Sequence, residues 1–127
     1  MKIISWNVNS VRARINYVNE LLKTEKPDFL CLQETKIIDS EFPIKNFTEL
    51  GYFSYFFGIP SYNGVAILSK KKLINIEKQG MCNKLDARML SAETTDFVLL
   101  SVYVPAGGDI PDPEINPKFK HKLLFLD

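Results

Sequence analysis

Apolar residues in this chain form short runs that alternate between the spacing of strands and the spacing of helices. Lys2–Val8 and Phe29–Leu32 are nearly continuous apolar runs, which are typical of strands buried on both faces. Between them, apolar residues recur at steps of four, three and four, which predicts a helix from Ser10 to Lys26. These apolar residues are Val11, Ile15, Val18 and Leu22. A right-handed crossover makes the two strands parallel, so their carboxyl ends lie at one edge of a sheet.

The rest of the chain predicts more strands than helices. Pro43 suits the first turn of a short helix that reaches about Leu50. The strand-like runs are Tyr52–Phe57, Gly64–Leu68, Leu73–Ile76, Met89–Glu93 and Phe97–Tyr103. Mostly short turns separate the last four, so we expect them to be antiparallel neighbours. The aromatic run Tyr52–Phe57 is expected in the core. Asn116 and Pro117 predict the start of a last helix, whose apolar face is still open at Asp127.

Composition narrows the class of protein. The length of 127 residues suits one domain. With a net charge of +1 the protein has no strong overall electrostatic field, so any surface that binds nucleic acid must be a local positive patch. The apolar runs are too short to span a bilayer, and Ser5 interrupts the first of them too early for a signal peptide. We therefore expect no membrane partner. Cys31 and Cys82 do not form a disulfide framework, and reduced thiols favour a cytoplasmic location.

Two residues with oxygen ligands end the two parallel strands. Asn7 follows the first apolar run and Glu34 follows the second, so both should lie at the edge where open α/β sheets bind ligands. Amide and carboxylate oxygens suit a hard cation such as Mg²⁺, which needs only one or two protein ligands beside water and phosphate. The alternative is that Asn7 is a turn residue and Glu34 an exposed carboxylate at the start of a loop.

Further polar residues lie near the same predicted edge. Tyr103 ends the last strand and enters a loop rich in glycine and proline, where its phenol is able to donate to a phosphate oxygen. Its alternative role is packing at a sheet edge. Arg12, Arg14 and Lys36 are candidates for contacts that position phosphates. His121, the only histidine, lies among lysines and is expected at the surface.

Four ordered blocks of sequence resemble exonuclease III and the related apurinic/apyrimidinic endonucleases, which belong to the endonuclease/exonuclease/phosphatase superfamily. The blocks are Trp6–Ala13, Leu32–Lys36, Tyr62–Ser69 and Val102–Pro105. Together they cover essentially the whole chain, and their order and spacing are far more specific than any one block. The resemblance implies a four-layer α/β sandwich with Mg²⁺ or Mn²⁺ at one edge. It also implies double-stranded DNA as partner, cleaved beside abasic sites or trimmed from 3′ ends.

The resemblance also implies roles for individual residues. Glu34 would be a metal ligand, and Asn7 would hold the metal or its hydrogen-bond network. Tyr103 would face the scissile phosphate and take part in catalysis. Asn9 stands where the family has an acidic or polar residue of the same network, and it would contact substrate together with Arg12 and Lys36.

The sequence also departs from the family. A later Gly-Asp-x-Asn block and a C-terminal Ser-Asp-His block, which supply the groups that activate water, do not occur, and Ala106 stands where some relatives have Asn or Gln. We therefore expect residues 1–127 to be the amino-terminal part of a single domain, truncated to about half of the sandwich. They would hold a mixed sheet with flanking helices and about one sheet's strands, so that an apolar inner face is exposed. Such a chain should be inactive alone and able to pair with a complementing carboxy-terminal half.

Two other interpretations stay open at this point. Asn7 and Glu34 equally fit another phosphoesterase of the superfamily that acts on lipid, inositol or RNA substrates. The lack of a general base at a matched position fits a non-catalytic remnant or interaction module.

Overall fold

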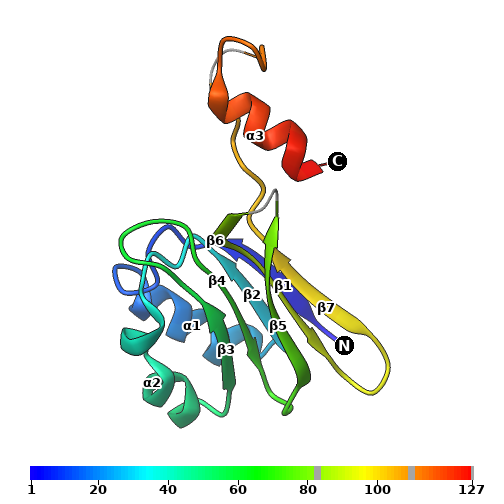
Figure 1. Cartoon of the computed structure of the whole chain (residues 1–127). Helices are drawn as coiled ribbons and strands as arrows, with labels where there is room; N and C mark the ends of the chain where they lie inside the picture. Colours follow the sequence, from blue (N-terminus) through cyan, green and yellow to red (C-terminus); the bar gives the residue numbers. More distant parts are fainter. Residues whose placement is uncertain (82–83, 109–110, 127) are drawn as a thin grey trace.

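The computed structural model describes residues 1–81, 84–108 and 111–126, and it shows an α/β fold whose sheets form a sandwich (Figure 1). The elements are β1 Ile3–Asn7, α1 Ile15–Glu25, β2 Phe29–Gln33, a 3₁₀ turn at Asp39–Glu41, α2 Ile44–Glu49, β3 Phe53–Phe57, β4 Val65–Ser69, β5 Ile74–Met81, β6 Lys84–Glu93, β7 Val98–Val102 and α3 Pro117–Leu126. The prediction from the apolar pattern is therefore confirmed in the order of its elements.

The strands form two sheets. The first is mixed, with the order β1-β2-β4-β3, and the second is antiparallel, with the order β5-β6-β7. β1 and β2 are parallel as predicted, and their carboxyl ends meet where Asn7 lies opposite Gln33. The expectation of four antiparallel neighbours was wrong for the strand at Gly64–Leu68. β4 pairs with β2 and β3, and the polar turn after Ser69 carries the chain into the other sheet.

Two apolar cores separate three layers. Leu30 and Leu32 of β2 face the helices α1 and α2, whereas Phe29 and Cys31 face the second sheet, so β2 is buried on both sides. The expectation that the chain holds about one sheet was wrong, because β6 and β7 cover the inner face of the first sheet. Exposed apolar side chains lie instead in several places, among them Leu100 on the outer face of the second sheet, which is 46% exposed, and Leu124 on α3, which is 53% exposed.

The first helix starts later than the apolar spacing predicted. Residues 11–14 form turns, and α1 begins only at Ile15. Ser10 still accepts a hydrogen bond at its Oγ from the Ala13 N–H (3.2 Å), but this bond closes the turn before the helix. Val11 is fully buried against the core although it is not helical. The apolar periodicity was produced by a turn and a helix that share one buried face.

Several smaller predictions are also decided. Within the aromatic run, Tyr52 is buried but Phe53 is 47% exposed, because it lies on the outer edge strand β3. Cys31 is a buried free cysteine, and burial raises the pKa of its thiol to about 11. Cys82 lies outside the described residues.

The predicted start of the last helix is confirmed: Asn116 precedes α3, and its Oδ1 accepts the Lys118 N–H (3.0 Å). In the described part of the chain, no helix combines the length and the apolar character needed to cross a bilayer.

Candidate functional site

Backbone hydrogen bonds join three loops and a segment of β6 into one platform at the carboxyl end of β1 and β2. The Ser10 N–H donates to the Glu34 carbonyl (2.8 Å), and the Lys36 N–H donates to the Asn63 carbonyl (2.9 Å). The Gly64 N–H then donates to the Ala87 carbonyl (2.9 Å), which lies in β6 of the second sheet. The platform therefore runs across both sheets and fixes the side chains that rise from it. We call these four segments (the loops at residues 7–11, 34–36 and 61–64, and residues 86–88 of β6) the loop platform.

The backbone of the loop platform is strained. Residues with positive φ other than glycine include Asn9 (46°), Glu34 (54°), Lys36 (54°), Asn63 (56°) and Ala87 (57°). Such conformations cost free energy and persist only where the surroundings impose them, and they concentrate at functional sites. This cluster is an independent structural sign that the loop platform serves a function.

Asn7 and Glu34 meet on this platform, as the strand–helix–strand unit predicted. The Asn7 Nδ2 donates to Glu34 Oε1 at 3.0 Å. This hydrogen bond is the main reason that the pKa of Glu34 is lowered, and burial opposes it. The carboxyl group is 20% exposed, so it is ionised at neutral pH and still accessible from solvent.

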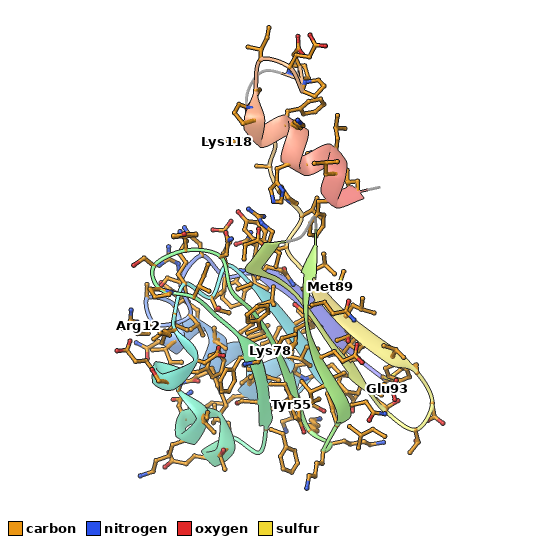
Figure 2. The ribbon with its side chains drawn as sticks, in the orientation of Figure 1. Arg12, Tyr55, Lys78, Met89, Glu93 and Lys118 are labelled. Atoms are coloured by element: carbon orange, nitrogen blue, oxygen red, sulfur yellow. The ribbon has the colours of Figure 1, made fainter. Side chains whose placement is uncertain are left out.

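Two of the three candidate substrate-binding residues join this pair. Lys36 Nζ donates to Asn9 Oδ1 (2.5 Å) and lies 3.6 Å from Glu34 Oε2. Arg12 does not join them, because its guanidinium forms an exposed ion pair with Glu41 (3.3 Å) on the side of the 3₁₀ turn (Figure 2). The structure thus brings Asn9 and Lys36 to the metal candidates and leaves Arg12 at the margin.

Tyr103 reaches the same carboxylate from the second sheet. Its phenol lies against the Glu34 carboxylate, and burial followed by the interaction with Glu34 raises the pKa of Tyr103. The side chain is only partly buried and so is not enclosed in the core, but that Tyr103 and Glu34 share one cleft stays a prediction. The alternative role is also present, because the Tyr103 ring packs against the core between the two sheets.

A buried polar bridge holds the two sheets in register directly below the site. Gln33, the residue before Glu34, donates from Nε2 to Ser101 Oγ (3.1 Å), and Ser101 Oγ donates to the Leu32 carbonyl (3.0 Å). Ser101 lies two residues before Tyr103. The bridge therefore links the end of β2 to the end of β7 and sets the separation of Glu34 and Tyr103.

Sequence reasoning missed the residues that support Tyr103. Arg88 lies over its ring, with Cζ 4.7 Å from the centroid, and binds Asp86 through Nε (2.8 Å). A signal for Arg88 was present in the strand pattern. The β6–β7 register pairs Met89 with Val102, so one further step along the hairpin places Arg88 opposite Tyr103.

His121 was expected at the surface, but its side chain is only 14% exposed and its Nε2 lies 3.4 Å from Asp86 Oδ2. That expectation was wrong because His121 lies against Asp86 of β6.

The donor set fits a hard divalent cation. An ionised carboxylate and a neighbouring amide are the ligand types that Mg²⁺ takes, and Mg²⁺ needs few protein ligands when water and phosphate fill its remaining positions. Within the described ranges, no group of three or more His, Cys, Asp or Glu residues is arranged around one point. Glu34 and Asn7 are therefore the ligands that this part of the fold would provide. The Lys36 side chain, which lies beside Glu34, would have to move when a cation binds.

The structure is thus a two-sheet α/β sandwich with a carboxylate, an amide and a tyrosine close together at one edge. Residues 4–122 match the Endonuclease/Exonuclease/phosphatase family, and the chain belongs to that family. The family resemblance inferred from the sequence blocks is confirmed.

Individual relatives agree with this assignment. The chain is 35% identical over 113 residues to exodeoxyribonuclease III from Haemophilus influenzae, covering 84% of this chain and 42% of that protein. Its structure is similar to an AP endonuclease from Archaeoglobus fulgidus, with a TM-score of 0.89 and 35% identity over 99% of this chain and 48% of the other. It is also similar to the 3′ phosphatase NExo from Neisseria, solved with a product DNA hairpin (TM-score 0.89, 33% identity, 98% and 48% covered). The chain thus spans a little less than half the length of each of these three relatives.

Proposed function

We propose that this chain is the amino-terminal part of a nuclease of the exonuclease III type that hydrolyses DNA phosphodiesters with Mg²⁺ or Mn²⁺. Its substrates would be double-stranded DNA at abasic sites and at 3′ ends. The observation that carries this proposal is the contact of Glu34 with both Asn7 and Tyr103 at one strained sheet edge. The names of the relatives, which include an exodeoxyribonuclease and a protein solved with a DNA hairpin, support the choice of DNA.

Each residue has a distinct task in this proposal. Glu34 supplies a charged oxygen to the cation, and Asn7 holds the carboxylate in place. The bound cation would neutralise charge on the phosphate. Tyr103 donates its phenol proton as a hydrogen bond toward a phosphate oxygen once the cation engages Glu34. Lys36 and Asn9 contact the flanking phosphate backbone, and Arg12 would reach it only by leaving Glu41.

The residues assigned to the reaction in this proposal do not form a complete catalytic site. Phosphodiester hydrolysis needs a group that orients and deprotonates water, and no residue at a matched position supplies one. A complementing carboxy-terminal half would bring it, and the assembled enzyme would work in the cytoplasm.

Binding of Mn²⁺, followed by electron paramagnetic resonance, tests the metal assignment without requiring turnover. We expect Glu34→Gln to weaken Mn²⁺ binding by ~10-fold or more, because a charged ligand becomes neutral. Glu20→Gln is the matched control, since Glu20 is an exposed carboxylate on α1. Equal Mn²⁺ affinity in the two variants would contradict the metal site.

Cleavage of an abasic-site duplex tests the reaction. The chain alone should leave the duplex intact, whereas the chain mixed with the carboxy-terminal half of Haemophilus influenzae exodeoxyribonuclease III should cleave it with Mg²⁺. Glu34→Gln and Tyr103→Phe should each reduce that cleavage by ~100-fold or more, as expected for groups that stabilise the transition state. Mg²⁺-dependent cleavage by the purified chain alone would show that the catalytic set is complete.

A further inference from the structure

A cavity of about 570 Å³ lies at the end of the sandwich opposite the loop platform. Its lining comes mainly from three segments, which are the start of β2, the turn between β4 and β5, and the turn between β6 and β7. Figure 1 shows both turns at the end of the sandwich that lies away from α3. Phe29 begins β2 at the cavity and Gln33 ends it just before Glu34, so about 15 Å of strand separates the cavity from the candidate site.

Hydrogen bonds hold the walls of this cavity in place. On the β4–β5 side, the Leu73 N–H donates to the Tyr55 hydroxyl (2.7 Å). On the β6–β7 side, Thr94 Oγ1 accepts the N–H groups of Asp96 and Phe97 (both 3.0 Å). Cavities that bind small molecules have volumes of several hundred Å³ and are largely formed before the ligand arrives. This cavity has both properties.

The floor of the cavity is apolar and aromatic. Phe29 and Leu73 line it, and both are buried members of the core between the two sheets. The Phe97 ring meets the Phe29 ring edge-on, with the ring centroids 5.7 Å apart. An apolar floor favours a ligand that carries a ring of its own, because contact between the two releases water from both surfaces.

The rim of the cavity carries opposite charges on different segments. Lys71 and Lys72 come from the β4–β5 turn, whereas Asp96 comes from the β6–β7 turn. Among the described residues, none of these three side chains has a hydrogen-bond or ion-pair partner. A second carboxylate, Asp28, already accepts the backbone N–H of Lys2 (2.7 Å). The rim therefore offers two adjacent ammonium groups to an anion and one carboxylate to a hydrogen-bond donor.

We propose that this cavity binds a nucleoside monophosphate, with its base over the apolar floor, its phosphate at Lys71 and Lys72, and a sugar hydroxyl or base amino group at Asp96. A phosphate carries close to two negative charges at neutral pH, which matches two neighbouring ammonium groups. An ionised carboxylate only accepts hydrogen bonds, so Asp96 requires a donor on the ligand. An aromatic amino acid has a ring, an anionic group and a donor too, but its carboxylate carries one charge for two lysines.

The proposed site is separate from the metal candidates and does not need them for binding. Under the proposed function, a nucleoside monophosphate is what trimming of a 3′ end releases. The cavity would then take up a product of the reaction at the opposite end of the sandwich. Binding there and cleavage at Glu34 can be tested independently, because they use no residue in common.

NMR titration of the nitrogen-15-labelled chain with deoxyadenosine 5′-monophosphate tests the site. EDTA is present, so that no cation joins the phosphate to Glu34. The amide signals report where the nucleotide binds, and their dependence on its concentration gives the affinity. We expect the signals of Leu73 and Thr95, which line the cavity, to move, and that of Lys36 on the loop platform to stay.

Variants of the β4–β5 turn test the phosphate contact. Lys71→Ala combined with Lys72→Ala should weaken nucleotide binding about ten- to a hundredfold, because hydrogen bonds to a charged group are lost. Lys70→Ala is the matched control, since it removes the same charge from the same turn. The Lys70 ammonium group does not line the cavity and donates to the Lys26 carbonyl (2.8 Å). We expect its affinity to equal that of wild type, and an equal loss in both variants would overturn the contact.

Two further ligands decide the chemistry of the site. Deoxyadenosine lacks the phosphate, so it should bind weakly and equally to wild type and to the doubly substituted variant. L-tryptophan should bind more weakly than the nucleotide, and tighter binding would overturn the nucleotide in favour of an aromatic amino acid. Shifts confined to the loop platform, or no shifts at all, would overturn the site. Neither result would affect the metal assignment, which the Mn²⁺ affinity of Glu34→Gln decides.

Discussion

The two ends of the sandwich differ in the backbone conformations that close them. At the end opposite the site, which we call the hairpin end, turns are closed locally: Ser69 Oγ accepts the Lys71 N–H (3.1 Å), and Thr94 Oγ1 accepts the N–H groups of Asp96 and Phe97 (both 3.0 Å). At the loop platform, bonds join residues more than twenty positions apart, such as Ser10 to Glu34. Long-range bonds also occur at the hairpin end, where the Lys70 N–H donates to the Asp28 carbonyl (3.1 Å). The ends therefore differ chiefly in that the loop platform gathers several non-glycine residues with positive φ, which the surrounding fold must hold.

This difference explains why the active-site candidates lie where they do. A strained conformation such as that of Glu34 (φ 54°) is kept only when many neighbouring contacts impose it. The platform provides these contacts from both sheets, and it points Glu34 and Tyr103 at one place. The hairpin end also contains a carboxylate with a lowered pKa, Asp28, but that group lies on an ordinary backbone and is held chiefly by the backbone N–H of Lys2. A lowered pKa alone does not identify a site, whereas the strained platform points to one.

The largest effect should follow from a side chain added inside the platform. Gly64 has φ +95°, and a Cβ there would collide with Thr35 Oγ1, so Gly64→Ala should destabilise the fold by about 3 kcal/mol from strain and overpacking. Gly51 near the hairpin end has φ +88° with no atom within 4 Å of a new Cβ, so Gly51→Ala should cost only about 1 kcal/mol. Urea unfolding of both variants measures the difference. Equal losses would mean that the platform is no more constrained than an ordinary turn.

A smaller effect should follow from removal of the buried bridge between the sheets. Ser101→Ala leaves Gln33 Nε2 and the Leu32 carbonyl without that hydroxyl, which should cost about 1–2 kcal/mol. Ser54 is the matched control, because its Oγ is buried and has no hydrogen-bond partner among the described residues. Ser54→Ala should change the free energy of unfolding by less than about 0.5 kcal/mol or stabilise the fold.

The same contrast between local and long-range closure governs what the sequence could predict. The approach of Asn7 to Glu34 was predictable, because one crossover rule makes two apolar runs parallel. The position of β4 was not, because the polar turn Ser69–Lys72 has the local pattern of a hairpin, whereas it joins two sheets. His121 was misplaced for a related reason: its position among lysines predicts solvent, and only tertiary packing brings it to Asp86.

Arg88 lies between the contacts that the sequence predicted and those that it did not. The hairpin β6–β7 was predicted, and its register alone places Arg88 opposite Tyr103. The functional meaning of that pairing needed a second fact, that the phenol of Tyr103 reaches Glu34 in the other sheet. Sequence patterns therefore predicted the parallel pair β1–β2 and the hairpin β6–β7, while the pairing of β4 and the contacts between the sheets came only with the fold.

The smallest effect concerns the ionisation of Glu34 itself. Asn7→Ala removes the hydrogen bond that chiefly lowers the pKa of Glu34, so that pKa should rise toward its ordinary value of 4.5. In contrast, the pKa of Asp28 should not move, because the Lys2 N–H that lowers it is untouched. Carbon-13 NMR titration of both carboxyl groups, without divalent cation, measures the two pKa values in one sample.

This change in ionisation also predicts the pH dependence of stability. A carboxyl group whose pKa is lowered by folding stabilises the folded state above its unfolded pKa, and that contribution is lost as the pH falls through the folded pKa. Wild type should therefore be more stable than Asn7→Ala near neutral pH, and the difference should shrink once the pH falls below about 4.5 and Glu34 takes up its proton. A difference that stays constant down to acid pH would show that Asn7 supports the platform by packing alone, and the link between Asn7 and the charge of Glu34 would then be lost.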